Sequence, residues 1–385
     1  MTVYLHAGTT KTGTTTIQRF LADNRGWMAG QGFVVPEVAG AANHTKLAAY
    51  ALAPDQQKPV RRELGLNTPE EVEAFRAGFR GAFARAVGDR RRNYLFTNEH
   101  CSAVLHSVEE LTVLRDLLAS SGHEVRVLLY VREPAEYLAS SYSTALKNGA
   151  HLPLKRPSPH ALETKYNYLS ICRRWSQVFG RENLTVRLFE RQSLLEGNIL
   201  LDFLQALGID PQQAPAAARA PQTANRSLDY LVAGFLQEFN EHLAEMPSDI
   251  SSAYRGDLAE LCEGLSHRES ILVPKPLRRF LYGRLQDDMA TFAAEFLGLP
   301  AEWPFPPYRE AGRQPVRKPD LDEAYALMTA LWIAKTASTQ RRQPVAPPAA
   351  RPQEPTPEPT PEPPSEEPGD AAEKGMIARL RGFWR

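Results

Sequence analysis

The sequence predicts an α/β fold of three layers, in which helices flank a central, mainly parallel β-sheet. Over the first 210 residues, apolar runs of strand length alternate with segments whose apolar residues recur at helical spacing. From about residue 227 the pattern becomes helical, and after residue 342 the chain turns into a Pro/Glu-rich tract. We therefore expect a sheet-containing core, a helical C-terminal portion and a disordered tail.

Short apolar runs are predicted as the strands of the sheet: Val3–His6, Phe33–Val35, Tyr94–Thr97, Val125–Val131 and Leu184–Phe189. Helical patterns follow these runs, at Thr14–Asn24, Pro69–Val87, Val108–Ser121, Pro134–Lys147, Tyr166–Phe179 and Asn198–Leu207. Because strands and helices alternate, successive strands are expected to run parallel and to be covered on both faces. A ligand is then expected beyond the carboxyl ends of the strands.

The second half of the chain is expected to complete the same domain with helices. One helix is predicted to begin with Ser227 as its N-cap, a second carries an apolar stripe from Leu277 to Phe296, and a third spans Leu321–Ala334. The predicted parts are an α/β core (1–210), a helical portion (211–340), a disordered linker (341–373) and a short basic amphipathic segment (374–385).

The charge balance excludes general binding to polyanions, because 45 Lys and Arg residues face 45 Asp and Glu residues. We therefore expect no nucleic-acid partner. The three cysteines, Cys101, Cys172 and Cys262, are scattered and form neither a disulfide framework nor a metal motif. No metal site is expected.

The chain shows no signal-peptide pattern and no apolar stretch of about 18 residues, so we expect a cytoplasmic protein without a transmembrane segment. The basic segment 374–385 carries apolar residues among Lys and Arg. It leaves open a peripheral contact with a membrane surface or with another protein.

A loop rich in Gly and Thr follows the first predicted strand and has the sequence HAGTTKTGTTT, from His6 to Thr16. Glycines allow a tight turn, amides at the start of the following helix favour negative charge, and a lysine and hydroxyls add donors. The candidate ligands of an anion are Gly8, Thr10, Lys11, Thr12, Gly13, Thr14 and Thr15. The loop is not a Walker A motif, because its lysine stands before the last glycine instead of after it.

The string HAGTTKTGTTTIQRFL closely resembles the phosphosulfate loop of bacterial, carbohydrate-type members of the sulfotransferase family that uses 3′-phosphoadenosine 5′-phosphosulfate (PAPS). The resemblance spans roughly residues 2–300 and is diffuse beyond 210. It implies a P-loop-like fold, PAPS as co-substrate and no metal. It also implies transfer of a sulfuryl group to a hydroxyl acceptor, on a saccharide or glycolipid.

A second motif carries the same resemblance. Family members place an Arg at the end of a strand and a Ser eight residues later on the next helix, and this pair binds the 3′-phosphate of the nucleotide. Arg132 ends the predicted strand Val125–Val131, and Ser140 stands eight residues further on. An Arg fork suits a phosphate group, and two helical turns bring Ser140 back toward the strand end.

The candidate base for the acceptor hydroxyl is Glu99, because it ends the predicted strand Tyr94–Thr97 and the carbohydrate-type relatives use a Glu there. His100 is the second candidate, and His44, in a loop that resembles the acceptor region of the relatives, is the third. Lys11 is the cation expected to stabilise the charge that grows on the bridging oxygen.

Two other functions stay open at this point. A P-loop nucleotide kinase or NTPase would also need a phosphate loop, but it would need magnesium and a Walker-type lysine. A non-catalytic nucleotide-binding homologue would keep the fold and use its tail as a tether. PAPS binding and transfer separate these alternatives.

Overall fold

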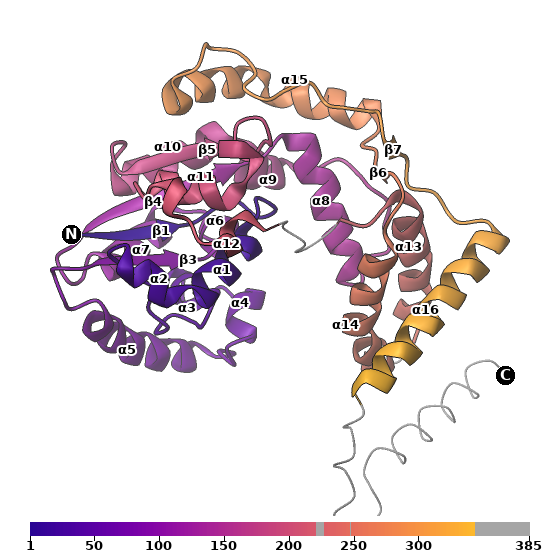
Figure 1. Ribbon diagram of the computed structural model, residues 1–385, viewed down its shortest axis with the longest axis horizontal. Coiled ribbons are helices and arrows are strands. Elements are labelled where there is room, and N and C mark those ends of the chain that lie inside the picture. Colours follow the sequence, from indigo (N-terminus) through magenta and orange to yellow (C-terminus); the bar gives the residue numbers. More distant parts are fainter. Residues whose placement is uncertain (221–226, 247, 343–385) are drawn as a thin grey trace, which may run out of the picture. The chain divides into compact units, whose positions relative to one another are not determined.

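A computed structural model of the chain describes residues 1–220, 227–246 and 248–342 (Figure 1). They fall into two compact units, which we describe separately. Unit 1 comprises Met1–Thr144, Pro153–Tyr230 and Arg268–Val316, and unit 2 comprises Ala145–Leu152, Leu231–His267 and Arg317–Arg385. Of the predicted linker 341–373, residues 341 and 342 belong to the helix Leu321–Arg342, and the rest lies outside the described residues, as does the basic segment 374–385.

Unit 1 is built on a parallel sheet with the strand order β2-β3-β1-β4-β5. Its strands are β1 (Thr2–His6), β2 (Phe33–Val34), β3 (Asn93–Thr97), β4 (Glu124–Val131) and β5 (Leu184–Leu188). The predicted α/β fold is confirmed, and each predicted strand is present within two residues of its expected bounds. In the sheet, β1 lies between β3 and β4, so the carboxyl ends of three strands meet at one edge.

One face of the sheet is covered by α1 (Thr14–Asp23), α2 (Arg25–Gly30) and α11 (Ile199–Ala206). The buried cluster there joins Ile17 and Phe203 to Leu95, Leu128 and Tyr130 of the strands. Since side chains alternate along a strand, the neighbours of these strand residues point to the opposite face.

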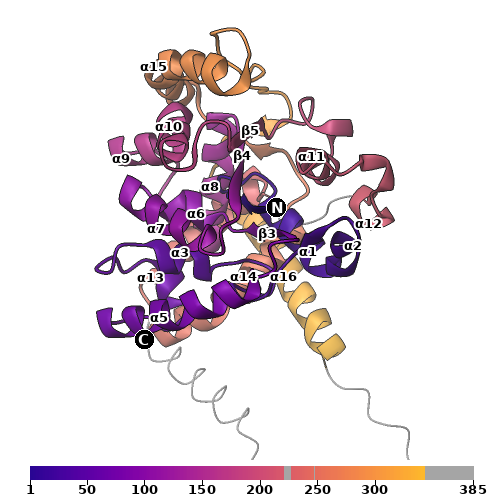
Figure 2. The ribbon, with the colours of Figure 1, turned by 90° about the vertical axis from the view of Figure 1, so that its left-hand side faces the viewer.

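The opposite face is covered by α5 (Pro69–Ala86) and α10 (Tyr168–Phe179), which the reader can follow in Figure 2. Phe83 of α5 stacks on Phe96 of β3, with ring centroids 5.2 Å apart, and α10 packs on β4 and β5. Both faces are therefore covered, as the near-continuous apolar strands predicted.

The other elements of this half of the chain are shorter or peripheral: α3 (Lys46–Ala51), α4 (Pro59–Arg62), α6 (His100–Val104), α7 (Val108–Leu118), α8 (Pro134–Lys147), α9 (Pro159–Ala161) and α12 (Ala216–Arg219). Further along the chain, α15 (Lys275–Phe292) lies between the two strands of a second, parallel pair, β6 (Ser270–Ile271) and β7 (Arg313–Gln314). This pair was not predicted from the sequence.

Unit 2 contains α13 (Tyr230–Ala244), α14 (Ser248–Leu265) and α16 (Leu321–Arg342), and α16 packs on α14. Gly234 allows a close approach inside the unit, because a Cβ atom there would lie 1.8 Å from the carbonyl oxygen of Arg317. The prediction that Ser227 caps a helix was wrong. The backbone amide of Leu228 donates to Ser143 Oγ at 2.9 Å, and α13 begins only at Tyr230.

Candidate functional site

The loop that joins β1 to α1 first continues alongside β4. The amide of Ala7 donates to the carbonyl of Leu128 at 3.0 Å, and the amide of Thr9 donates to the carbonyl of Tyr130 at 3.1 Å. The Thr9 hydroxyl donates to the same carbonyl at 2.8 Å. These three bonds fix the first half of the loop against a strand that lies about 120 residues away in the sequence.

The second half of the loop turns sharply at two residues with positive φ, Lys11 (71°) and Gly13 (75°). Glycine adopts this conformation without strain, whereas lysine does so at a cost. Gly13 also gives α1 no side-chain cap, and no acidic residue stands in the first turn. The positive end of the helix dipole is therefore directed at the loop without a neutralising side chain.

The loop threonines have different positions. Thr12 is buried, and its hydroxyl donates to the carbonyl of Thr9 at 2.5 Å, so this side chain shapes the loop instead of facing a ligand. The Thr10 hydroxyl bonds to Tyr137 of α8 at 2.9 Å. Thr14 is buried and Thr15 is half-buried at the start of α1. Of the predicted hydroxyl donors, Thr10 and Thr15 are thus half-buried, and Thr12 and Thr14 are buried.

Arg132, at the end of β4, reaches this loop. Its Nη1 donates to the carbonyl of Lys11 at 3.2 Å, and its guanidinium lies over the ring of Phe189, 5.7 Å from the ring centre. Its Nη2 pairs with Glu136 at 3.4 Å. The structure therefore brings together the predicted cation at the strand end and the predicted anion loop.

Ser140 stands one helical turn after Glu136 on α8 and is half-buried. Residues four apart share one face of a helix, so Ser140 lies on the face of α8 that carries the partner of Arg132. This position agrees with the predicted role of Ser140, which stays a prediction.

A second arginine at this site was not predicted from the sequence. Arg313 of β7 also forms an ion pair with Glu136, and its guanidinium lies 4.9 Å from the centre of the Tyr308 ring. Glu136 thus holds two guanidinium groups, Arg132 and Arg313, from segments about 180 residues apart. No periodic pattern surrounds Arg313, so the sequence offered no signal for it.

Glu133 lies beside this arginine pair and is almost fully buried. One carboxylate oxygen accepts the amide of Glu136 at 2.7 Å, and the other has no hydrogen-bond partner. Burial raises the pKa of Glu133 to about 7, and the neighbouring Glu136 acts in the same direction. Burial, with Glu136 again, also raises the pKa of Glu190. Protonation of these carboxyls would increase the net positive charge at the strand end.

On the other side of the loop, Glu99 follows β3 and is half-buried. Its carboxylate accepts a hydrogen bond from Gln18 of α1 at 2.5 Å. The hydroxyl of Ser102, one turn further along α6, donates to the carbonyls of Gly8 and Glu99, at 3.1 and 3.0 Å. Glu99 is therefore attached both to α1 and, through Ser102, to the loop.

His44 does not have the position of a base. It is fully buried, its Nε2 donates to the carbonyl of Pro36 at 2.9 Å, and its Nδ1 accepts the amide of Thr97 at 2.8 Å. Burial lowers the pKa of His44 to about 4, and both ring nitrogens are occupied by backbone groups. We therefore assign His44 a structural role and do not retain it as a candidate base.

The other two histidines of this region, His6 and His100, differ in burial. His6 is buried, bonds to the Thr97 hydroxyl through Nδ1 at 2.9 Å, and has an Nε2 atom without a hydrogen-bond partner. Burial lowers the pKa of His6 to about 3, so the ring is neutral. His100 is half-buried at the start of α6, next to Glu99, and stays the second candidate base.

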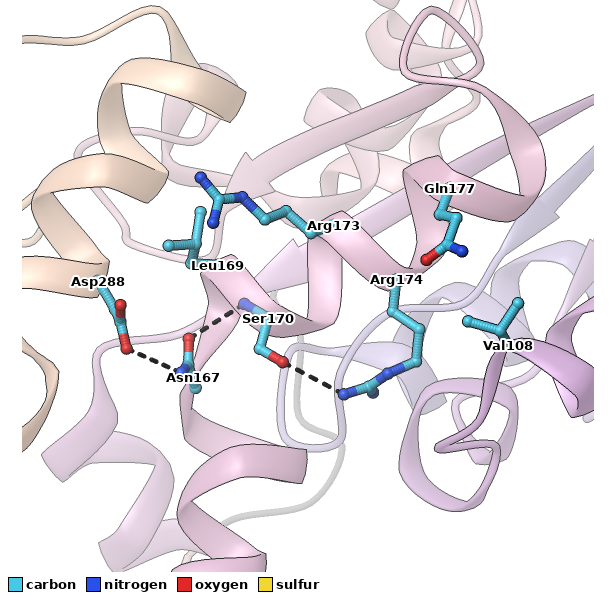
Figure 3. Close-up of a pocket in the computed structure, with 8 residues that line it drawn as sticks. All are labelled: Val108, Asn167, Leu169, Ser170, Arg173, Arg174, Gln177 and Asp288. Carbon is cyan, nitrogen blue, oxygen red and sulfur yellow. Dashed lines mark hydrogen bonds between the residues drawn. The ribbon is translucent and has the colours of Figure 1, made fainter.

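Two cavities lie near these elements. A small one of about 90 Å³ touches the loop and is lined by Thr9, Thr10, Ser102, Ala103, Tyr137, Thr164, Lys165 and Ile171. A larger, open hollow of about 360 Å³ lies over α10 and is lined by Val108, Asn167, Leu169, Ser170, Arg173, Arg174, Gln177 and Asp288 (Figure 3). Its polar side chains bond to one another, for example Asn167 to Asp288 at 2.9 Å. None of the predicted site residues lines this larger hollow.

Within residues 1–220, 227–246 and 248–342, no group of three His, Cys, Asp or Glu side chains is placed to hold a metal ion. Over the same part of the chain, no helix combines the length and apolar character needed to cross a membrane.

Comparisons with known proteins give distant similarities. No family model matches the chain. An uncharacterized protein of Archaeoglobus fulgidus is 34% identical over 124 residues, which are 32% of this chain and 33% of that protein. The crystal structure of a sulfotransferase from Alicyclobacillus acidocaldarius covers 72% of this chain and 98% of its own chain, with 16% identity and a TM-score of 0.36. At that TM-score the likeness is too distant to assign chemistry.

Proposed function

We propose that the protein is a PAPS-dependent sulfotransferase. The observation that carries this proposal is the bond between Arg132 and the carbonyl of Lys11, because it joins two predicted anion sites. One is a loop with the order Lys-Thr-Gly-Thr-Thr, and the other is a strand-end arginine with a serine eight residues later. PAPS carries a 5′-phosphosulfate and a 3′-phosphate on one ribose, so adjacent anion sites suit it.

In this proposal the loop binds the 5′-phosphosulfate through its backbone amides, the start of α1 and the hydroxyl of Thr15. Lys11 neutralises the charge that develops on the oxygen between phosphorus and sulfur. Arg132 and Ser140 bind the 3′-phosphate. Arg313 adds a second guanidinium beside Arg132, on the shared partner Glu136.

The transfer step needs a base for the acceptor. The acceptor oxygen attacks sulfur, the bond from sulfur to the bridging oxygen breaks, and adenosine 3′,5′-bisphosphate leaves. Glu99 takes the acceptor proton, with His100 as the second candidate. The hydrogen bond from Gln18 supports Glu99, because it fixes the orientation of the carboxylate beside the loop.

We propose a sugar hydroxyl, on a saccharide or glycolipid, as the acceptor, and the cytoplasm as the location of the protein. The acceptor rests on the family resemblance and on a carboxylate base at the end of β3. No residue of the described chain is assigned to the sugar itself.

The test is a transfer assay with radiolabelled PAPS against glycan and phenol acceptors, together with calorimetry of adenosine 3′,5′-bisphosphate binding. We expect Glu99→Gln to lower turnover by about 10²–10⁴-fold while nucleotide affinity stays within about twofold. The exposed Glu302→Gln serves as the matched control and should be neutral. Absence of nucleotide binding by the unaltered protein would disprove the proposal. Full turnover in Glu99→Gln would show that Glu99 is not the base and would leave His100 as the candidate.

A further inference from the structure

The outer face of α16 exposes large apolar side chains in a row. Leu321, Tyr325, Met328 and Trp332, which we call the α16 stripe, are between 53% and 75% exposed. On the inner face Leu327 is buried, where α16 packs on α14. Isolated exposed apolar residues are ordinary on a protein surface, but a contiguous row of this size marks an interaction surface.

The spacing of the stripe is that of a helix–helix seam. Its members are four, three and four residues apart, so they fall within one narrow strip of the helix surface. At 1.5 Å per residue the stripe is about 17 Å long, which is the length of about three helical turns. The stripe therefore fits another short amphipathic helix.

The N-terminal end of the stripe is acidic. The first turn of α16 carries Asp322 and Glu323, and Asp320 precedes it. Elsewhere in unit 2, lysines neutralise some of the carboxylates, because Glu238 pairs with Lys318 and Glu263 pairs with Lys147. Helices that bind anionic membranes instead carry Lys and Arg beside their apolar face. The acidic start of α16 thus favours a basic peptide over an anionic lipid surface.

The chain itself contains such a peptide outside the described residues. Segment 374–385, KGMIARLRGFWR, has Met376, Ile377, Leu380, Phe383 and Trp384 at the spacing of one helix face. Its basic residues are Lys374, Arg379, Arg381 and Arg385, and it contains no acidic residue. Its apolar face extends over nine residues, a length that fits within the stripe.

We propose that segment 374–385 docks on the α16 stripe of the same chain. Residues 343–373 form the connection between the two. A 31-residue tether spans about 30 Å as a flexible coil and up to about 95 Å as an extended polyproline helix. The path from residue 342 back to Met328 is about 21 Å along α16. The tether is therefore long enough, and it holds the segment at an effective concentration in the millimolar range.

A second copy of the chain fits the stripe less well. A seam about 17 Å long buries less area than the roughly 800 Å² per partner of a stable interface. A tethered partner needs less contact area because its association is intramolecular.

The experiment is hydrogen–deuterium exchange on the full-length protein, with native mass spectrometry for the oligomeric state. The variant Leu380→Asp places a charge at the centre of the apolar face of the segment. The matched control Ala378→Asp places the same charge on the opposite face. Neither change touches unit 1, so nucleotide binding should stay unaltered and reports independently on the proposed function.

We expect exchange over residues 321–334 to rise about tenfold in Leu380→Asp and to stay unchanged in Ala378→Asp. In the unaltered protein this protection should not vary over an about fiftyfold range of protein concentration. Equal exchange in all three proteins would overturn the proposal. Protection that increases with concentration and accompanies a dimer mass would overturn it in favour of a second copy. Protection that appears only with phosphatidylserine-containing vesicles would overturn it in favour of a membrane.

Discussion

Lys11 combines a chemical role with an unfavourable backbone conformation. Its φ of 71° lies in the left-handed region, which costs a non-glycine residue about 1 kcal/mol. Gly13 adopts the same left-handed region without strain, with a φ of 75°, but position 11 keeps a side chain. A strained residue that the loop retains is consistent with a requirement for its ammonium group.

The first prediction compares Lys11→Gly with Lys11→Ala. Both should lower sulfuryl transfer by about 10²-fold or more, because both remove the cation. Lys11→Gly should nevertheless be the more stable of the two by roughly 0.5–1 kcal/mol, because glycine adopts the left-handed conformation freely. Thermal unfolding and labelled-PAPS turnover are the measurements, with the exposed Lys275→Ala as control. Equal stability of the two variants would show that the turn is not strained.

The second prediction concerns the buried carboxyl of Glu133. Burial raises its pKa to about 7 in the folded protein, above the ordinary value of 4.5. The folded state therefore binds the proton more tightly than the unfolded state, and the stability that this provides decreases as the pH rises from about 4.5 to 7. The upper limit of this change is on the order of 3 kcal/mol.

Glu133→Gln should remove this pH dependence, because the amide stays neutral. Urea unfolding at pH 5 and pH 8 should show a smaller difference in unfolding free energy for the variant than for the unaltered protein. The surface change Glu302→Gln should leave the difference as it is. If Glu133→Gln retains the full difference, another group is responsible for it.

At the scale of elements, Asp202 links α11 to two strands. Its carboxylate is fully buried, accepts the hydroxyl of Tyr130 of β4 at 2.6 Å, and pairs with Arg187 of β5 through two bonds of 2.6 Å. The carbonyl of Tyr130 in turn accepts the amide and hydroxyl of Thr9. The position of the anion loop therefore depends on a residue that faces the core.

The third prediction is that Asp202→Asn destabilises the protein by about 2 kcal/mol, because Arg187 then loses its charged partner. Nucleotide affinity should also decrease, although residue 202 does not face the loop. Urea unfolding and calorimetry are the measurements, and Asp23→Asn, at an exposed helix end, is the control. A loss of less than about 0.5 kcal/mol would mean that water replaces the pair.

Local sequence patterns were sufficient to predict the sheet and the anion loop, but not the contacts between distant segments. Val125–Val131 is an apolar run bounded by a turn, so its strand could be predicted from neighbouring residues alone. The start of α13 could not be predicted in this way, because the amide of Leu228 bonds to Ser143, 85 residues earlier. The pairing of Gln18 with Glu99, and of Arg313 with Glu136, likewise depends on how distant segments meet.

At the scale of the whole molecule, the chain folds into two compact units, and Gly234 is a point of close backbone approach within unit 2. A Cβ at this position would lie 1.8 Å from the carbonyl oxygen of Arg317, far inside van der Waals contact. Backbone cannot move aside as a flexible side chain would. The backbone at Arg317, which leads into α16, therefore packs directly against Gly234 of α13.

The fourth prediction is that Gly234→Ala destabilises unit 2 by about 2 kcal/mol or more. An added methyl group would force α13 away from the segment at Arg317. Gly264→Ala, in the same unit with nothing within 4 Å of the added Cβ, should instead stabilise by about 0.5–1 kcal/mol. Hydrogen exchange of α13 and of β1 separates an effect on unit 2 from an effect on the sheet. Equal exchange in the two variants would contradict the close approach.

The central place of β1 has a consequence for the time at which the site can form. The strand precedes both of its partners in the chain, because β3 is residues 93–97 and β4 is residues 124–131. During synthesis the anion loop can obtain its hydrogen bonds only after Tyr130 has left the ribosome. Until then β1 has neither of its strand partners, and unpaired strands in partly folded chains are prone to aggregation. The anion loop is thus completed only after about 120 further residues have been made.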